Sequence, residues 1–229
     1  MKLLLWNAFT NNHLPEREVF LKIRYQALKC NADILVIYDV TLPEDQRRKY
    51  NEILSYFSNW DYSAAFPYFY DQNVLIFSKK KIIGVEMLKT DILGEPDYNP
   101  LNKESNTFFR FKLLGGLTVD FIHDHPERRQ QDRITALKWY YLHFNRLDDP
   151  TTVLVGNLVE NSVAGPVMKH LSGIGFGNVA PVEPTYPSSR PMFNADCVFL
   201  WKDMRLIKSE LINNAATTHF PILVEFSWG

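Results

Sequence analysis

The chain has 229 residues, of which 46% are hydrophobic and 22% are charged, and its formal net charge is −1. This length and composition are typical of one soluble globular domain with a large core, and no stretch rich in Pro, Gly or Ser divides residues 1–229. The near-neutral charge excludes a global basic field, so any contact with nucleic acid has to come from a local patch.

The first sixty residues alternate between two expected strands and two expected helices. In chain order these elements span residues 2–6, 15–30, 33–40 and 44–57. The strands are continuous apolar runs, whereas apolar residues recur at helical spacing in the helices. Asn7 follows the first strand, and Asp39 lies near the end of the second, where a carboxylate is costly unless it is solvated or paired.

Two hairpins are expected in the middle of the chain. Their strands, in order, are at residues 74–77, 82–88, 108–114 and 117–122. The lysines at 79–81 would form the turn of the first hairpin, and Gly115-Gly116, which suits a tight primed turn, the turn of the second. The polar segment 90–106 between the hairpins is expected to be a long surface loop.

The last third is organised around an apolar strand at residues 152–155. Gly156 is expected to end this strand, which would place Asn157 in a turn at the rim of a sheet. The other expected elements are helices at 132–144 and 163–171, a loop with four prolines at 181–191, and strands at 196–200 and 221–226.

The two cysteines lie far apart in the sequence, each among apolar neighbours. Cys30 and Cys197 are therefore expected to be buried thiols in a reducing compartment and not a disulfide, with the cytosol as the default. The apolar run at 3–6 is too short for a secretory signal. No stretch approaches the ~20 apolar residues of a membrane span, so no membrane contact is expected.

Polar residues recur where the apolar runs stop. They are Asn7, Asp39, His123 with Asp124 and His125, Asn157, Asp196 and His219. Each alone has an ordinary structural explanation, such as a turn contact or a packed histidine. Together they are what a phosphate-ester site requires, with amide and carboxylate oxygens for Mg²⁺ and imidazoles for phosphoryl oxygens. We therefore expect these side chains to converge at one edge of the sheets.

Six segments, in order, resemble the endonuclease/exonuclease/phosphatase superfamily. They are residues 3–9, 32–40, 117–125, 152–161, 193–200 and 217–226, so the resemblance covers nearly the whole chain. Residues 14–17, Arg133 and the strand 151–157 further resemble the 5′-tyrosyl-DNA phosphodiesterase branch. The resemblance implies an α/β fold, a four-layer sandwich in which two mixed, largely antiparallel sheets pack face to face with helices outside.

The resemblance also implies roles for the matched residues. Asn7 matches the asparagine of the metal site, and Asp39 stands in place of a metal-binding glutamate. His219 matches the histidine that contacts the scissile phosphate, and Asp196 the acidic residue of the penultimate motif. The mid-chain histidine of the family is best matched by His123, with His125 as the alternative.

Three matched positions depart from the family. Asn157 replaces the aspartate that orients or deprotonates the attacking water, and Val159 replaces an asparagine that holds the phosphate. Thr218 replaces the aspartate before His219, and this change is expected to remove the carboxylate partner of that histidine. Because only Asp39 and Asp196 remain as carboxylates among the matched positions, Mg²⁺ is expected to be weakly bound or absent. Losing a general base typically costs about 10²–10⁴ in rate, so hydrolysis is expected to be very weak.

Three interpretations remain open at this stage. The first is a protein that keeps the fold, has lost ordinary Mg²⁺-dependent hydrolysis, and binds a phosphate ester, nucleic acid or protein partner. The second is an active phosphodiesterase with a rearranged site around one metal ion and with Glu160 or Asp124 as the replacement base. The third is an unrelated α/β protein.

Two features bear on a nucleic-acid partner. Basic groups occur at 79–81 and 128–129, and aromatic residues are dense over 60–70. Basic groups beside aromatics bind single strands through phosphate contacts and stacking. The competing interpretation is a solvated turn and a small aromatic core. The sequence does not determine the oligomeric state.

Overall fold

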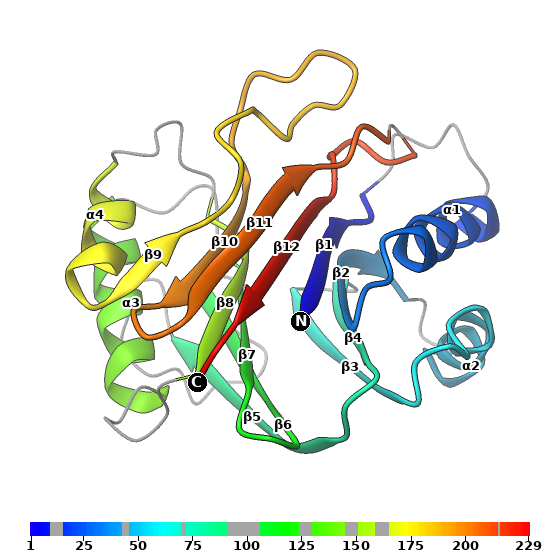
Figure 1. Cartoon of the computed structure of the whole chain (residues 1–229), viewed down its shortest axis with the longest axis horizontal. Helices are drawn as coiled ribbons and strands as arrows, with labels where there is room; N and C mark the ends of the chain where they lie inside the picture. The colour runs from blue at the N-terminus through cyan, green and yellow to red at the C-terminus, as the bar shows by residue number, and fades with distance from the viewer. Residues whose placement is uncertain are drawn as a thin grey trace.

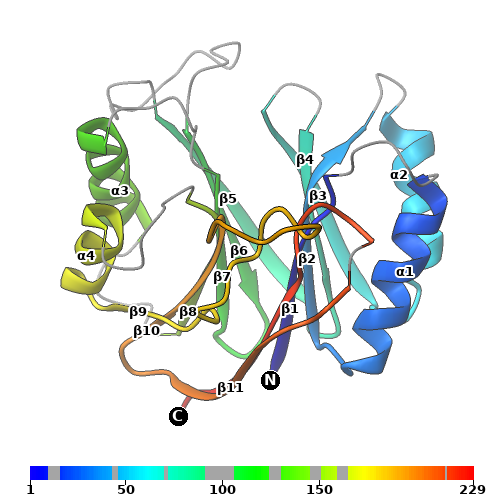
Figure 2. The same cartoon turned by 90° about the horizontal axis from the view of Figure 1, so that it is seen from above.

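The computed structural model describes residues 1–9, 16–42, 46–69, 72–90, 106–123, 130–144, 151–158, 165–214 and 216–229. These residues form two six-stranded mixed sheets that face each other, with two helices on the outer side of each sheet (Figures 1 and 2). The expected four-layer α/β sandwich is therefore confirmed. Within the described ranges, no helix is both long enough and apolar enough to cross a membrane.

The first sheet joins both ends of the chain in the strand order β11-β12-β1-β2-β4-β3. Its strands are β1 (Lys2–Asn7), β2 (Ile34–Thr41), β3 (Tyr62–Phe69), β4 (Gln72–Ser78), β11 (Arg205–Leu211) and β12 (Ile222–Ser227). β1 and β2 run parallel and are connected through α1 (Glu16–Lys29), whereas the other pairs are antiparallel. The helices α1 and α2 (Gln46–Tyr56) cover the outer face of this sheet (Figure 2).

The second sheet has the strand order β5-β6-β7-β8-β10-β9. Its strands are β5 (Ile82–Thr90), β6 (Asn106–Leu113), β7 (Thr118–His123), β8 (Thr152–Asn157), β9 (Phe176–Asn178) and β10 (Asp196–Trp201). The parallel pair β7 and β8 is connected through α3 (Gln130–Phe144), which covers the outer face together with α4 (Pro166–Gly173) (Figure 2).

The core consists of three apolar layers, because alternate side chains of a strand point to opposite faces. In β1, Leu3 and Leu5 pack between the two sheets, whereas Leu4 and Trp6 pack under the helices of the first sheet. A third layer lies between the second sheet and α3 and α4. Strands buried on both faces read as continuous apolar runs, which is why the sequence marks the central strands clearly.

The hairpin predicted around residues 79–81 is wrong. β4 lies in the first sheet between β2 and β3, whereas β5 pairs with β6 in the second sheet. Because β4 already has a neighbour on each side, it has no edge to offer β5, and the lysine turn carries the chain from one sheet to the other. The second predicted hairpin is confirmed, since β6 and β7 pair antiparallel and Gly115 and Gly116 have φ values of 95° and 82°.

Three strands were not predicted, namely β3, β9 and β11. β3 contains Pro67 and lies at the edge of its sheet, where the missing N–H of proline is tolerated. It accounts for much of the aromatic segment at 60–70, in which Trp60 and Tyr68 are buried and Phe66 packs on Phe109. Most of the predicted loop at 90–106, and residues 128–129, lie outside the described residues.

Candidate functional site

The strand register places the predicted polar residues at one end of the two sheets. In the first sheet Asn7 pairs with Tyr38, the residue before Asp39. In the second sheet His123 pairs with Asn157, which in turn pairs with Asp196 on its other side. Strand ends that are neighbours in register bring their side chains to a common rim. Each sheet therefore contributes a row of polar residues.

Asp39 lies in a closed hydrogen-bonded cluster with Asn7 and Tyr68. The Asn7 amide donates to Oδ2 of Asp39 at 2.5 Å, and the Tyr68 hydroxyl donates to Oδ1. The backbone N–H of Asp39 donates to the same hydroxyl at 2.9 Å. Asp39 has a φ of 57° and lies where the register of β2 and β4 shifts. This unusual conformation turns its carboxylate and its N–H toward one tyrosine.

Asp196 and His219 form a buried pair. Nδ1 of His219 lies 2.8 Å from Oδ2 of Asp196, and their side chains are 7% and 3% exposed. Oδ2 also accepts a hydrogen bond from Thr185, and Oδ1 accepts one from the Tyr38 hydroxyl. Three hydrogen bonds hold this carboxylate in place, and the carboxylate in turn orients the imidazole.

Two tyrosines connect the sheets at this end. Tyr38 belongs to the first sheet and binds Asp196 of the second, while the Tyr68 ring packs against His123 with 4.6 Å between centroids. Six of the residues named at strand ends are described, and these six are thus linked by contacts or by strand pairing. Burial raises the pKa of Tyr38 well above its ordinary value, and Asp196 raises it further, so this hydroxyl stays a donor.

The expectation that His219 has lost its carboxylate partner is wrong. The partner is Asp196, which reaches His219 from the start of β10, and residue 218 does not occupy that place. Thr218 instead donates its hydroxyl to the carbonyl of Phe9 at 2.9 Å. The hydroxyl of neighbouring Thr217 accepts a hydrogen bond from the indole N–H of Trp6 and donates one to the carbonyl of His219. Both threonines therefore fasten the segment that presents the histidine.

The sequence indicated that Gly156 ends the strand, but β8 continues to Asn157. The φ of Gly156 is 142°, and a Cβ at this position would lie 1.8 Å from the carbonyl oxygen of Ile122 in the neighbouring strand. Only glycine permits this close approach of two backbones. The glycine thus brings Asn157 level with His123, and Asn157 is 8% exposed.

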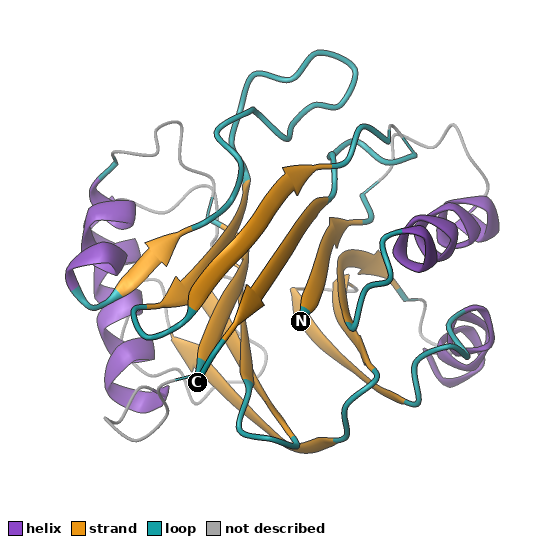
Figure 3. Cartoon of the chain, viewed as in Figure 1, coloured by secondary structure: helices purple, strands orange, loops and turns teal. Residues whose placement is uncertain are grey.

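Sequence reasoning missed four residues of the site, namely Tyr38, Tyr68, Thr185 and Tyr186. The last two lie in the loop between β9 and β10, which extends beyond the strand ends (Figure 3). The Tyr186 ring lies over His219 with 4.5 Å between centroids and 32° between planes. The position of Tyr38 directly before Asp39 was the available signal. Asp124, His125, Val159 and Glu160 lie outside the described residues.

The resemblance implies Mg²⁺, and the described residues do not fit this ion. Mg²⁺ requires several oxygen ligands, at least one from a carboxylate. Both oxygens of Asp39 already accept hydrogen bonds, the side-chain oxygen of Asn7 accepts the N–H of Phe9 at 2.8 Å, and Asp196 is held by three donors. In the described part of the chain, no three His, Cys, Asp or Glu residues gather as a metal site would need.

Neither a family model nor a curated protein matches the sequence, but solved structures match the fold. An endonuclease/exonuclease/phosphatase family protein from Bacteroides thetaiotaomicron has a TM-score of 0.77 at 11% identity, covering 100% of this chain and 95% of that one. A mannosyl-6-phosphatase from the same species has a TM-score of 0.73 at 11% identity, covering 100% of both chains. D. rerio TDP2, complexed with a single-stranded DNA product, has a TM-score of 0.72 at 10% identity, covering 99% and 98%.

These likenesses establish the fold, which is that of endonuclease/exonuclease/phosphatase proteins. The resemblance found in the sequence is confirmed at this level, and an unrelated α/β fold is excluded. Phosphatases and a DNA-bound protein share the architecture at nearly equal identity. The fold alone therefore does not select an activity or a substrate.

Proposed function

We propose that the chain binds a phosphate ester at the polar end of the two sheets, and that it has lost the Mg²⁺-dependent hydrolysis associated with its fold. The buried pair of His219 and Asp196 is the observation that supports binding. Asp196 holds Nδ1, so Nε2 is the ring nitrogen that would meet a phosphoryl oxygen. An imidazolium held by a carboxylate is a suitable donor to such an anion.

One amino-acid change supports the loss of hydrolysis. Asn157 has nearly the shape of aspartate but cannot accept a proton from water at neutral pH. The hydrogen bonds on both oxygens of Asp39 add to this, because their donors are a neutral amide and a hydroxyl, which do not polarise a phosphoryl group as a metal ion would. Binding can persist under these conditions since it requires a donor and not a base.

The active interpretation stays the second candidate, because the pair of His219 and Asp196 is intact. An imidazolium of this kind can stabilise a developing phosphoryl charge, and Glu160 or Asp124, both outside the described residues, would then serve as the base. The two candidates differ in one measurable property, which is turnover.

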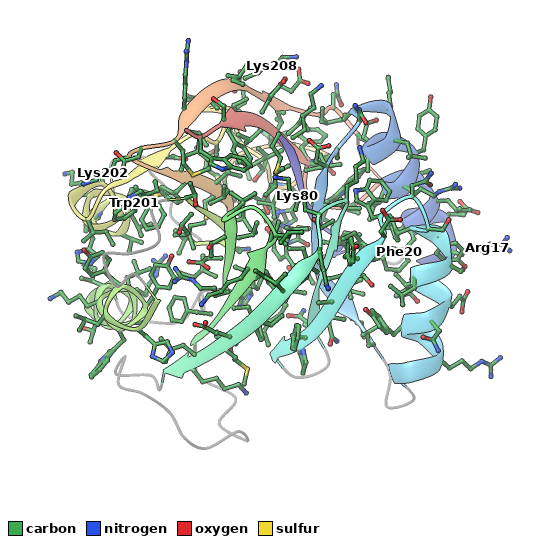
Figure 4. The ribbon with its side chains drawn as sticks, turned by 60° about the horizontal axis from the view of Figure 1, so that its bottom comes forward. Arg17, Phe20, Lys80, Trp201, Lys202 and Lys208 are labelled. Atoms are coloured by element: carbon green, nitrogen blue, oxygen red, sulfur yellow. The ribbon has the colours of Figure 1, made fainter. Side chains whose placement is uncertain are left out.

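Three lysines labelled in Figure 4 do not form a basic groove that would favour nucleic acid over other phosphate esters. Lys80, Lys202 and Lys208 lie on separate parts of the surface (Figure 4). Lys80 lies over the Trp228 ring at 4.9 Å, in the turn at the opposite end of the sheets from Asn7. A backbone-tracking groove requires adjacent cations. We therefore propose a phosphate ester as the ligand class and leave its organic part open to experiment.

The test measures binding and turnover of two probes, bis-p-nitrophenyl phosphate and a 5′-phosphorylated single-stranded oligonucleotide. We expect measurable binding of at least one probe by the wild type, at least tenfold weaker binding by His219→Ala, and no turnover with or without Mg²⁺. His143→Ala, on the exposed surface of α3, is the matched control and should bind like the wild type.

Two outcomes would count against the proposal. Turnover by the wild type that disappears in His219→Ala would establish the active candidate. Failure of both probes to bind, or equal binding by the wild type and His219→Ala, would remove the site as a phosphate-ester site.

A further inference from the structure

The cluster around Asp39 is complete without any ligand. Both carboxylate oxygens accept a hydrogen bond, one from the Asn7 amide and the other from the Tyr68 hydroxyl. The hydroxyl is itself fixed, because it also accepts the backbone N–H of Asp39 at 2.9 Å. A single tyrosine therefore binds Asp39 at its backbone and at its side chain.

Each donor is held in the orientation that the carboxylate needs. The N–H of Phe9 donates to the side-chain oxygen of Asn7 at 2.8 Å, which turns the amide nitrogen toward Asp39. Tyr68 is 5% exposed, and its ring packs against Phe121, which holds its hydroxyl beside Asp39.

A divalent cation that joined Asp39 and Asn7 would need the Asn7 side-chain oxygen to face Asp39, where the amide nitrogen now lies. Mg²⁺ and Mn²⁺ bind carboxylate and amide oxygens directly, and neither accepts a donor in the position of a ligand. To bind both residues, a cation would have to reverse the Asn7 amide, and it would compete with the Tyr68 hydroxyl for Oδ1. Reversing the amide would leave the N–H of Phe9 without its present acceptor.

We propose that the Tyr68 hydroxyl and the Asn7 amide take the place around Asp39 that the family resemblance gives to a divalent cation. The chain satisfies its remaining metal-site carboxylate with its own donors, so this end of the sheets is built to stand without a metal ion. The inference goes beyond the proposed function, and its test needs no phosphate ester, so the two can fail separately.

The test counts bound Mn²⁺ by electron paramagnetic resonance and follows the melting temperature. Tyr68→Phe keeps the packed ring and removes only the donor to Asp39. We expect this variant to melt below the wild type without metal, to regain stability with Mn²⁺, and to bind Mn²⁺ at least tenfold more tightly than the wild type. The matched control is Tyr62→Phe, which alters a 37% exposed tyrosine at the other end of β3.

A second variant tests the same inference without changing Tyr68. Asn7→Asp replaces the donor to Oδ2 with a second carboxylate, and the resulting like-charge repulsion should be relieved by Mn²⁺. Adding Asp39→Asn to either variant should abolish the Mn²⁺ binding.

Two results would overturn the inference. The first is stoichiometric Mn²⁺ binding by the wild type that is as tight as in Tyr68→Phe. The second is that neither Tyr68→Phe nor Asn7→Asp gains affinity for Mn²⁺ although the circular dichroism spectrum shows a folded chain.

Discussion

Nδ1 of His219 lies 2.8 Å from Oδ2 of Asp196, although the two residues belong to segments of different sheets. Asp196 begins β10 of the second sheet, and His219 lies just before β12 of the first. The pair therefore couples the position of a candidate phosphate-binding histidine to the packing of the sheets. The same carboxylate also accepts a hydrogen bond from the hydroxyl of Tyr38 in β2, so Asp196 makes two contacts with residues of the other half of the sandwich.

Removing the Asp196 carboxylate should destabilise the whole fold. Asp196→Ala leaves three buried donors without their acceptor, and each such loss costs about 1–3 kcal/mol. Thr185→Val removes one donor and should cost about 1 kcal/mol. Urea unfolding of both variants measures the two losses. Equal losses would mean that Asp196 does not act as the shared acceptor.

Replacing Gly156 should be among the most damaging changes in the chain. In Gly156→Ala the new Cβ would meet the Ile122 carbonyl oxygen at 1.8 Å, so β7 and β8 would have to separate. We expect a loss above about 4 kcal/mol in the free energy of unfolding, or no folded protein.

A control separates crowding from backbone strain at this glycine. Gly116 has a φ of 82°, but the space around an added methyl is open, so Gly116→Ala should lower the free energy of unfolding by only about 1–2 kcal/mol. Chemical denaturation of both variants compares the two effects. A Gly156→Ala protein as stable as Gly116→Ala would contradict the close approach of the strands.

A second buried charged cluster should contribute to stability and not to binding. Both carboxylate oxygens of Asp120 accept hydrogen bonds from Arg110, at 2.9 and 2.8 Å, and one of them also accepts a hydrogen bond from the Tyr140 hydroxyl at 2.6 Å. Asp120→Ala should lower the free energy of unfolding by about 3–5 kcal/mol, whereas Tyr140→Phe should lower it by about 1 kcal/mol. Probe binding by folded Tyr140→Phe should equal that of the wild type, and a tenfold change would link this cluster to the site.

His170 should make the chain less stable in mild acid. Burial lowers the pKa of this histidine in α4 from its ordinary value of 6.5, and Lys138 lowers it further. The unfolded chain therefore binds a proton at a higher pH than the folded chain, so the free energy of unfolding falls as the pH drops below 6.5. His170→Gln removes this contribution, and its melting temperature should fall less between pH 7 and 5.5. An identical fall in both proteins would contradict the prediction.

Much of the site could be located from strand ends. The apolar runs before Asn7, Asp39 and Asn157 belong to central strands that are buried on both faces, and this burial leaves a strong local pattern. The polar residue at the end of such a run is then conspicuous. The site residues Tyr38 and Tyr68 could not be found in this way, because in an apolar strand they read as ordinary aromatic core.

The sequence by itself determined the central strands and the residues at their polar ends, since these follow from local periodicity and composition. The layered α/β class was what its resemblance to a known superfamily implied. Only the tertiary structure decided which carboxylate holds His219, which donors hold Asp39, and that the lysine turn crosses between sheets. Those relationships depend on how two separate sheets face each other. Such packing joins residues far apart in the chain, and no local pattern of residues specifies it.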